Sequence, residues 1–415
     1  MKIGKKKEAR ISRSALEMSF FLLVLSQATA IPNGIIQSAF EYTGVFFLLL
    51  SLIFNRFNSS SHTHNINIWY ALSIGTGLSV GLLLQPMSIS IKLRALVPAL
   101  VFWMIFTMSE GIIGSVRQLR RISYAIILAM ILALILAVAR GNNLFEENGL
   151  GGRFYFGFNG GILYKNYYSS TVLAAFIGLY IALKYGQKPR VFDIALLIAL
   201  TFFIFLASSN GTFLTMIAFL AILYTVEFVS KIKSTQRRVL VVGVCIIGLT
   251  LFLILFYSVA LKNQNYLYRM QGLINYIAEF GSNKFCILFG NGALAYAPGK
   301  SYVENIVSVT GWDGTLELSW LGILIKNGLI GVFAYIIVFA RLLFRTFRFN
   351  KKVKALSFAI IVSLLISSLV ETYIQNIHVI FGVYMFLLAF SCDRAISNKQ
   401  SYMCVRVVNK NQENY

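Results

Sequence analysis

The chain has 415 residues, of which 58% are hydrophobic and only 13% are charged. A soluble domain usually carries about 25% charged residues, so this composition excludes an ordinary soluble protein. The formal net charge of +22 would suggest nucleic-acid binding. The basic residues fall between long apolar segments, however, where a membrane surface explains them without nucleic acid. We therefore predict an all-α polytopic membrane protein embedded in the lipid bilayer, with no nucleic-acid partner.

Twelve apolar segments are each long enough for a transmembrane helix, which needs about 20 residues. If the N-terminus is cytoplasmic, the inner connections, both termini and the inner end of the span 317–344 (Arg341) hold 27 of the 37 Lys and Arg residues. This asymmetry follows the positive-inside rule and places both termini in the cytoplasm. The predicted spans are 15–32, 35–54, 68–85, 93–113, 122–139, 167–183, 191–207, 211–229, 239–261, 317–344, 355–372 and 376–392.

The basic runs "SVRQLRRI", "SKIKSTQRR" and "RLLFRTFRFNKKVK" are interpreted as orientation anchors beside anionic lipid. The first 30 residues are similar to a secretory signal, but eleven further spans favour an uncleaved first crossing. The predicted organisation is a cytoplasmic basic N-terminus (1–14), helices one to nine (15–261) with an outer loop at 140–166, a large extracytoplasmic loop (262–316), helices ten to twelve (317–392) and a cytoplasmic tail (393–415).

The two long outer connections are the predicted functional regions, since long connections in a compact membrane domain tend to carry function. The first, "RGNNLFEENGLGGRFYFGFNGGILYKN", is rich in glycine, aromatic and basic residues. The second opens with "NQNYLYRMQGLINYIAEF", whose apolar spacing predicts an amphipathic helix on the membrane surface. Arginine forks suit a pyrophosphate, and we expect tyrosine rings to suit sugars. The alternative is that these residues are loop charges and interfacial aromatic anchors.

The segment "DGTLELSWLGILIKNGLIG" (313–331) places two carboxylates at the start of an apolar helix. Asp313 and Glu317 are four residues apart and would share one helix face. Ionisable groups at membrane depth usually line a site, so Asp313 is a candidate general base or hydroxyl ligand. The alternative is that Asp313 caps the helix while Glu317 stabilises its first turn. Lys326 would pair with a carboxylate or extend to the surface.

Three stretches resemble the Wzy-type polysaccharide polymerases and the related O-antigen ligases of bacterial cell envelopes. "GRFYFGFNGGILYKNYYSSTVLAAFIGLY" is similar to the family's Arg-Gly-aromatic-Asn segment, and "LASSNGTFLTMIAFLAIL" to its Ser-Arg-Gly turn, with Asn210 where arginine is usual. "YRMQGLINYIAEFGSNKFCILFGNGALAYA", followed by "DGTLELSWLGILIKNGLIGVFAYI", is similar to the signature region. In that region a Gly-x-Gly turn (Gly290 and Gly292) precedes a polar-started helix that ends in Gly-Leu-Ile-Gly (Gly328 and Gly331).

The resemblance implies a membrane glycosyltransferase with a GT-C-like architecture of about twelve helices in the bacterial inner membrane. Such an enzyme transfers a growing glycan en bloc from undecaprenyl pyrophosphate to a new lipid-linked repeat unit. The product would be the O-antigen of lipopolysaccharide, a capsule or an exopolysaccharide. The expected partners are the undecaprenyl-pyrophosphate-linked glycan and the flippase and chain-length regulator of the same pathway, and no metal or other cofactor is expected.

The resemblance also suggests roles for individual residues. Arg153 and then Arg269 are the first candidates to bind the pyrophosphate, with Arg140 and Lys165 behind them. Asp313 and Glu317 are the catalytic candidates. The glycan-binding candidates are Tyr155, Asn159, Asn166 and Tyr296.

Two features of the sequence help to choose between a polymerase, a ligase and a transporter. The ligases typically carry a histidine where Asp313 stands, and the histidines here lie in an inner loop (His62 and His64) or in the last predicted span (His378). This difference favours a polymerase over a ligase. A transporter would place ionisable groups near mid-membrane, whereas the carboxylates here lie towards span ends. Glu371, in "SSLVETYIQN", is a candidate near the outer surface, but a solvated span end is the favoured interpretation.

Overall fold

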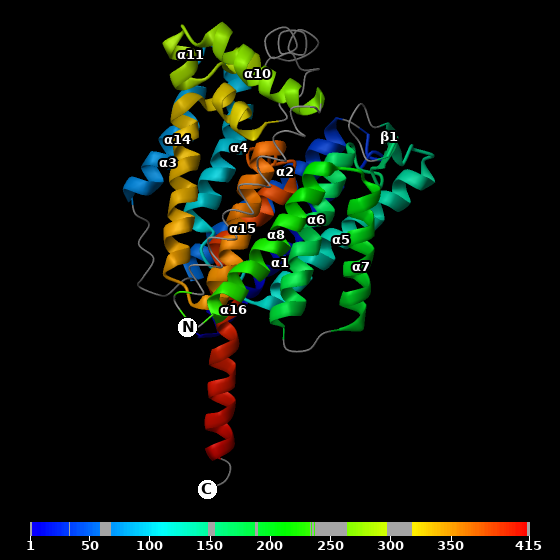
Figure 1. Cartoon of the computed structure of the whole chain (residues 1–415), viewed down its shortest axis with the longest axis vertical. Coiled ribbons are helices and arrows are strands. Elements are labelled where there is room, and N and C mark those ends of the chain that lie inside the picture. The colour runs from blue at the N-terminus through cyan, green and yellow to red at the C-terminus, as the bar shows by residue number, and fades with distance from the viewer. Residues whose placement is uncertain are drawn as a thin grey trace.

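The computed structural model describes residues 2–32, 34–58, 68–147, 154–186, 190–232, 234, 236, 264–296 and 318–412. Among these, it leaves undescribed the side chains of 2–10, 57–58, 264–270, 293, 296 and 397–412. The described chain is a helical bundle with one small hairpin (Figure 1). The helices are α1 (Lys2–Leu25), α2 (Ile35–Asn58), α3 (Ile68–Leu84), α4 (Ile89–Met108), α5 (Val116–Ala139), α6 (Lys165–Tyr185), α7 (Val191–Leu206), α8 (Asn210–Lys231), α10 (Gln264–Phe280), α11 (Lys284–Phe289), α12 (Gly292–Tyr296), α14 (Ser319–Phe347), α15 (Lys351–Val370) and α16 (Ile380–Gln412).

Seven of the described helices are long and apolar enough to cross a membrane, and α3 and α7 are shorter apolar helices. The chain is therefore a mostly helical, polytopic membrane protein, as its composition predicts. The predicted span 239–261 lies outside the described residues, so the count of twelve stays a prediction. The predicted amphipathic helix at the start of the second long connection is confirmed as a helix by α10.

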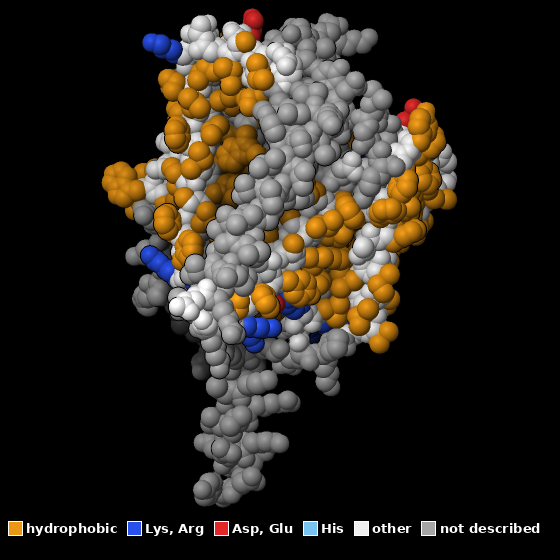
Figure 2. Space-filling model, in the orientation of Figure 1, with side chains coloured by type: hydrophobic (Ala, Val, Ile, Leu, Met, Phe, Trp, Pro, Cys, Tyr) orange, Lys and Arg blue, Asp and Glu red, His pale blue; other side chains and the backbone are white. Residues whose placement is uncertain are grey.

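The bundle has two distinct ends. Both termini lie at one end, which we call the terminal face, whereas α10, α11 and β1 lie at the other end, which we call the loop face (Figure 1). Hydrophobic side chains cover the flank between the two ends, and the visible Lys and Arg side chains gather mainly near the terminal face (Figure 2). This arrangement matches a membrane protein whose apolar belt faces lipid.

Helix α6 forms the centre of the bundle. In α6, 78% of the apolar window is buried inside the protein, compared with 28% in α8. Its inward surface is built from small residues, which let neighbouring helices approach closely in a membrane. At Gly178, an added Cβ would lie 2.0 Å from the Tyr384 hydroxyl and 2.4 Å from Ser123 Oγ. Glycine is therefore required where α5, α6 and α16 meet.

Helix α14 is interrupted within the predicted span 317–344. Gly328 has φ 65° and ψ −167°, which breaks the helix into 319–327 and 329–347. The ring centroids of Trp320 and Phe339 lie 6.2 Å apart, whereas a straight helix would separate these positions by about 28 Å. The short half therefore folds back alongside the long half, and the break falls in the Gly-Leu-Ile-Gly stretch where the polar-started helix was predicted to end.

Polar groups from two other segments satisfy carbonyls next to this break. Asn291 N donates to Ile325 O at 2.7 Å, and Gln85 Nε2, directly after α3, donates to Lys326 O at 3.2 Å. The contact between α11 and α14 is backbone to backbone, because an added Cβ at Gly328 would lie 2.2 Å from Leu288 O. The break is thus held by α3 and by the segment joining α11 to α12.

The first long connection carries a two-stranded antiparallel hairpin, β1 (Phe145–Glu147) and β2 (Phe156–Phe158), which the sequence analysis did not predict. The Glu146 carboxylate accepts a hydrogen bond from Lys165 N at 2.8 Å, so β1 supplies an acidic cap for the start of α6. The same connection is tied to the end of α1, since Leu163 N donates to Gln27 O at 2.9 Å.

Candidate functional site

The connection between α15 and α16, residues 371–379, is the centre of the loop face. The sequence predicted helix as far as 372 and again from 376, but α15 ends at Val370 and α16 begins at Ile380. Glu371 is extended, with φ −146° and ψ 167°. The extended backbone lets this 371–379 loop reach three other helices and the segment that follows α1. It contacts α6 and α8 through Tyr373, α14 through the carbonyls of Glu371 and Ile374, and Gln27, after α1, through the carbonyl of His378.

Thr212, in the first turn of α8, is the hub of a buried polar cluster. Its Oγ1 lies 2.9 Å from Ser169 Oγ on α6, 3.1 Å from Ser209 Oγ and 3.1 Å from the Tyr373 hydroxyl. The Tyr373 hydroxyl also donates to Asn166 O at 3.3 Å. A hydroxyl has one donor and two acceptor positions, so Thr212 is fully used in joining α6, α8 and the 371–379 loop.

The turn before α8 stores backbone strain. Ser208 has φ 55°, a left-handed conformation that is uncommon for a non-glycine residue. Its buried side chain accepts a hydrogen bond from Phe154 N at 3.1 Å. Strained residues persist only where surrounding contacts hold them, and they cluster at functional sites. Ser208 therefore attaches the 140–166 connection to this cluster.

Glu371 lies at the amino-terminal end of α8. The side chain is only 7% exposed, and its Oε1 would lie 3.2 Å from a Cβ added at Gly211, in the first turn of that helix. The positive end of the helix dipole favours a carboxylate there. The backbone carbonyl of Glu371 accepts a hydrogen bond from Ser319 Oγ at the start of α14. The interpretation of Glu371 as a solvated span end was therefore wrong.

Three helices begin around this polar cluster: α6 at Lys165, α8 at Asn210 and the short half of α14 at Ser319. The 371–379 loop is bonded to the first or second turn of each. The amino-terminal N–H groups of a helix have no intrahelical partners and carry partial positive charge, which favours anions. At α6 and α8 this position is already held by the carboxylates of Glu146 and Glu371, so the hydroxyls and amides around the cluster are the groups that can contact a hydroxyl-rich substrate.

The other face of the short half of α14 packs against the second long connection. Tyr276 of α10 and Leu294 of α12 form a buried apolar cluster with Leu321, Leu324 and Ile325. Burial raises the pKa of the Tyr276 hydroxyl, so this group stays neutral. The extracytoplasmic segment predicted from the sequence is thus in direct contact with the helix that begins next to the candidate site.

The described residues include several of the predicted substrate-binding positions. Asn166 belongs to the polar cluster through its carbonyl, and Lys165 begins α6. Asn159 is buried, and its Oδ1 accepts from Gly161 N at 3.0 Å, which gives it a role in shaping the turn. Tyr155 is 69% exposed beside β2. Arg140 is exposed at the end of α5.

The remaining predicted site residues are only partly placed or not placed. Arg269 lies on α10 and Tyr296 on α12, and only their backbone is described. Arg153, Asp313 and Glu317 lie outside the described residues. The sequence analysis did not identify Thr212, Tyr373 or Ser208 as site residues. A signal was present in "SSLVETYIQN", where a polar run interrupts an apolar segment.

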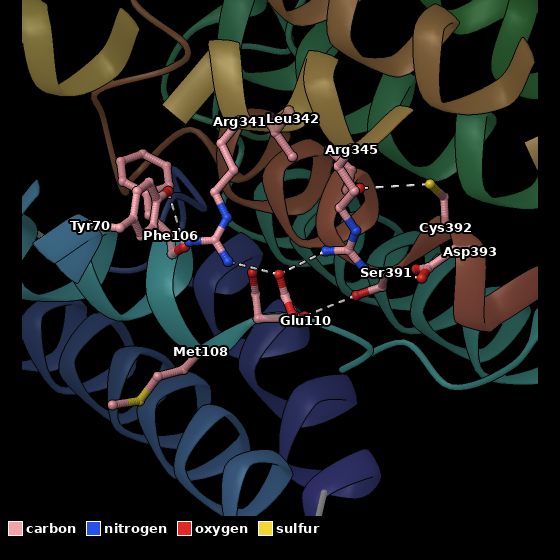
Figure 3. A network of polar contacts seen from close by, with 12 residues as sticks. Tyr70, Phe106, Met108, Glu110, Arg341, Leu342, Arg345, Ser391, Cys392 and Asp393 are labelled. Atoms are coloured by element: carbon pink, nitrogen blue, oxygen red, sulfur yellow. Dashed lines mark hydrogen bonds and ion pairs between the residues drawn. The ribbon is translucent and has the colours of Figure 1, made fainter. Parts of the chain in front are cut away.

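A second group of charged residues lies near the terminal face and has a different character (Figure 3). Arg341 and Arg345 of α14 both bind Glu110 Oε1, at 3.0 and 3.1 Å, and Arg345 also binds Asp393 at 3.0 Å. The Arg341 guanidinium stacks 4.0 Å from the centre of the Tyr70 ring. These opposite charges neutralise one another and connect α3, α14 and α16 to the α4–α5 connection, so the group is structural.

This network revises the interpretation of the basic run "RLLFRTFRFNKKVK", because its first two arginines are engaged inside the bundle rather than left to anionic lipid. The run "SVRQLRRI" also contains an arginine that is paired with a carboxylate inside the bundle. Arg120 Nε lies 3.0 Å from Asp193 Oδ2, and the Asp193 side chain is fully buried. Carboxylates near the terminal ends of the helices therefore serve as partners for the basic residues that sequence analysis treated as surface anchors.

No protein-family model matches the sequence, and no curated protein matches it significantly. The described residues contain no group of His, Cys, Asp and Glu side chains suited to a metal ion. Any assignment of function to this chain therefore rests on its own residues and their geometry.

Proposed function

We propose that the protein polymerises undecaprenyl-pyrophosphate-linked oligosaccharide repeat units into a surface polysaccharide, by en bloc glycosyl transfer at the outer face of the bacterial cytoplasmic membrane. In this proposal the architecture is GT-C-like with twelve spans, both termini are cytoplasmic, and the loop face is extracytoplasmic. The observation that carries the proposal is the convergence of three helix amino termini on the buried polar cluster around Thr212 and Tyr373.

The leaving group of this reaction is an undecaprenyl pyrophosphate, whose negative charge grows as the glycosidic bond breaks. Positive groups that bind it more tightly at that stage lower the barrier. We assign this role to Arg153 and Arg269. Arg153 belongs to the connection that Ser208 attaches to the cluster, and Arg269 lies on α10, about two helical turns before Tyr276.

The acceptor hydroxyl loses a proton during transfer, so a base must lie close to it. Asp313 and Glu317 precede Ser319 by six and two residues along the chain. Ser319 itself is bonded to the 371–379 loop. We assign Asp313 the role of base and Glu317 that of orienting the acceptor. No metal or other cofactor enters the proposal.

Deletion of the gene, followed by sizing of the surface glycan, tests the reaction class. A polymerase deletion leaves single repeat units, whereas a ligase deletion leaves long chains on the carrier lipid. Unchanged polymer on a normal carrier would refute both.

Substitution of the arginines tests the site. Arg153→Ala and Arg269→Ala should abolish or greatly shorten the polymer at normal protein levels. Lysine at either position should rescue only partly, because it keeps the charge and loses the bidentate fork. Arg121→Ala is the matched control, since Arg121 is half exposed near the terminal face. Full-length polymer from both alanine variants would remove these arginines from the site.

The two candidate roles of Asp313 are separable. Asparagine caps a helix about as well as aspartate but cannot accept a proton at neutral pH. Asp313→Asn should therefore accumulate in the membrane and leave the glycan at one repeat unit if Asp313 is the base. Long polymer from a well-expressed Asp313→Asn variant would show that the residue is only a cap.

A further inference from the structure

A second set of polar and aromatic side chains lies on the loop face beside the buried cluster. We call it the tyrosine shelf and define it as Tyr164, Tyr167, Asn376, His378 and Glu41. The rings of Tyr164 and Tyr167 meet edge to face with centroids 5.2 Å apart. Asn376 Nδ2 donates to the Tyr167 hydroxyl at 3.3 Å, and Asn376 Oδ1 accepts from His378 N at 3.0 Å. His378 Nδ1 lies 3.5 Å from Glu41 Oε1.

Gln27, two residues after the end of α1, bonds to both of the segments that carry the shelf. Gln27 Nε2 donates to the His378 carbonyl, and Gln27 O accepts from Leu163 N at 2.9 Å, which is next to Tyr164 in the chain. Gln27 is 3% exposed. Three segments far apart in sequence (27, 163–167 and 376–378) are thus fixed against one another, and the shelf is a built surface rather than a chance gathering of side chains.

His378 lies in a different environment from the one predicted from the sequence. The prediction placed this residue inside the last span, but it lies in the 371–379 loop with a side chain that is 47% exposed. Tyr164 is 53% exposed. The shelf therefore presents the Tyr164 ring and the His378 imidazole outward. The Asn376 amide lies beside them, and the Glu41 carboxylate comes from α2.

This composition fits a sugar better than it fits lipid. Tyrosine offers a rigid apolar face with a polar tip, which suits the C–H face of a pyranose and its rim of hydroxyls. The Asn376 amide and the Glu41 carboxylate add directional acceptors and donors for hydroxyl groups. A surface that faces acyl chains would not hold a paired imidazole and carboxylate.

We propose that the tyrosine shelf binds a sugar ring of the glycan that the enzyme elongates. This inference rests on the proposed function and deepens it. Tyr167 immediately follows Asn166, whose carbonyl belongs to the buried cluster. A glycan with its reacting end at that cluster would place a neighbouring sugar over the shelf, which would hold the chain in register during transfer.

The test uses the full chain in nanodiscs and, as probe, the oligosaccharide released by mild acid from the surface glycan of cells that produce this protein. Saturation-transfer difference NMR measures binding of the probe. Tyr164→Ala and His378→Ala should each weaken binding roughly tenfold, as truncation of an interface anchor does. Tyr164→Phe, which keeps the ring, should retain most of it. Tyr224→Ala is the control, because Tyr224 is 55% exposed on α8 towards the terminal face.

The outcomes separate this inference from the proposed function. The proposal that the shelf binds a sugar fails if the wild type does not bind the probe. It also fails if both alanine variants bind the probe as tightly as the wild type. If gene deletion leaves polymer length unchanged while the shelf variants still lose binding, the polymerase proposal fails and the shelf stands as a glycan site. If deletion leaves single repeat units and the shelf variants bind and polymerise normally, the polymerase proposal stands and the shelf does not.

Discussion

Replacement of Gly328 by alanine tests the break in α14. The backbone there has φ 65° and ψ −167°, a region occupied almost only by glycine, so alanine costs about 1–3 kcal/mol in strain. The added Cβ would also lie 2.2 Å from Leu288 O and 2.6 Å from Gly290 N. Overpacking of this kind costs about 1–3 kcal/mol more. We therefore expect Gly328→Ala to lower the free energy of unfolding by roughly 2–6 kcal/mol.

Two other glycines separate these contributions. Gly141 has φ 69° with no atom within 4 Å of an added Cβ, so Gly141→Ala isolates the backbone strain at about 1–2 kcal/mol. Gly114 has an ordinary φ, and the nearest atom would lie 3.8 Å away, so Gly114→Ala should be close to neutral.

Thermal unfolding of the purified protein can be followed with a thiol-reactive fluorogenic dye, because Cys392 is fully buried. The expected order of Tm is Gly114→Ala near wild type, then Gly141→Ala, then Gly328→Ala. Equal Tm values for Gly141→Ala and Gly328→Ala would show that the contact with α11 does not lock the break. A wild-type Tm for Gly328→Ala would refute the break itself.

Three further predictions concern the other contacts. Glu110→Gln leaves two arginines without their shared carboxylate; because all three side chains are partly exposed, we expect a loss of about 1–3 kcal/mol in the same assay, and an unchanged Tm would contradict it. Thr212→Val removes the hub hydroxyl and should cost about 1–3 kcal/mol and shorten the glycan, whereas Thr212→Ser should retain both properties. In a variant whose only cysteine is Cys286, a membrane-impermeant maleimide should label intact cells. Since burial raises the pKa of the Cys286 thiol, labelling should be slow at pH 7 and accelerate as the pH rises, and protection from the reagent at every pH would place the loop face inside.

Hydropathy and charge predicted the helical membrane class, and helical spacing predicted α10 almost to the residue, at 263–280 against Gln264–Phe280. These features depend on local composition and period, which a single sequence carries. The Gly-Leu-Ile-Gly stretch was predicted to end a helix, but the return of the short half along the long half was not predicted, because it depends on contacts from Gln85 and Asn291.

The candidate site was predictable only in part. Asn166 was identified from its place in a polar, aromatic-rich loop, and it does join the buried cluster. Tyr373 and Thr212 were missed because their importance comes from meeting across 161 positions of the chain. Burial of Glu371 was missed for the same reason, since its solvent exposure depends on α8 and α14 packing over it.

The short β hairpin could not be expected from period, because each strand has only three residues. It is attached to the bundle through Glu146, which bonds to the start of α6. Such a hairpin is specified by its attachments rather than by strand propensity.

In the proposed orientation, the paired arginines near the terminal face act at two separate stages of the protein's life. A nascent span is oriented before its tertiary partners are in place, and acidic residues contribute little to that decision. Arg341 and Arg345 then count as free positive charges that keep their end of the span in the cytoplasm. Once the bundle closes, the same two side chains become partners of Glu110 and Asp393. A carboxylate substitution here would therefore weaken the finished fold without inverting the topology, whereas loss of both arginines would affect biogenesis as well as stability.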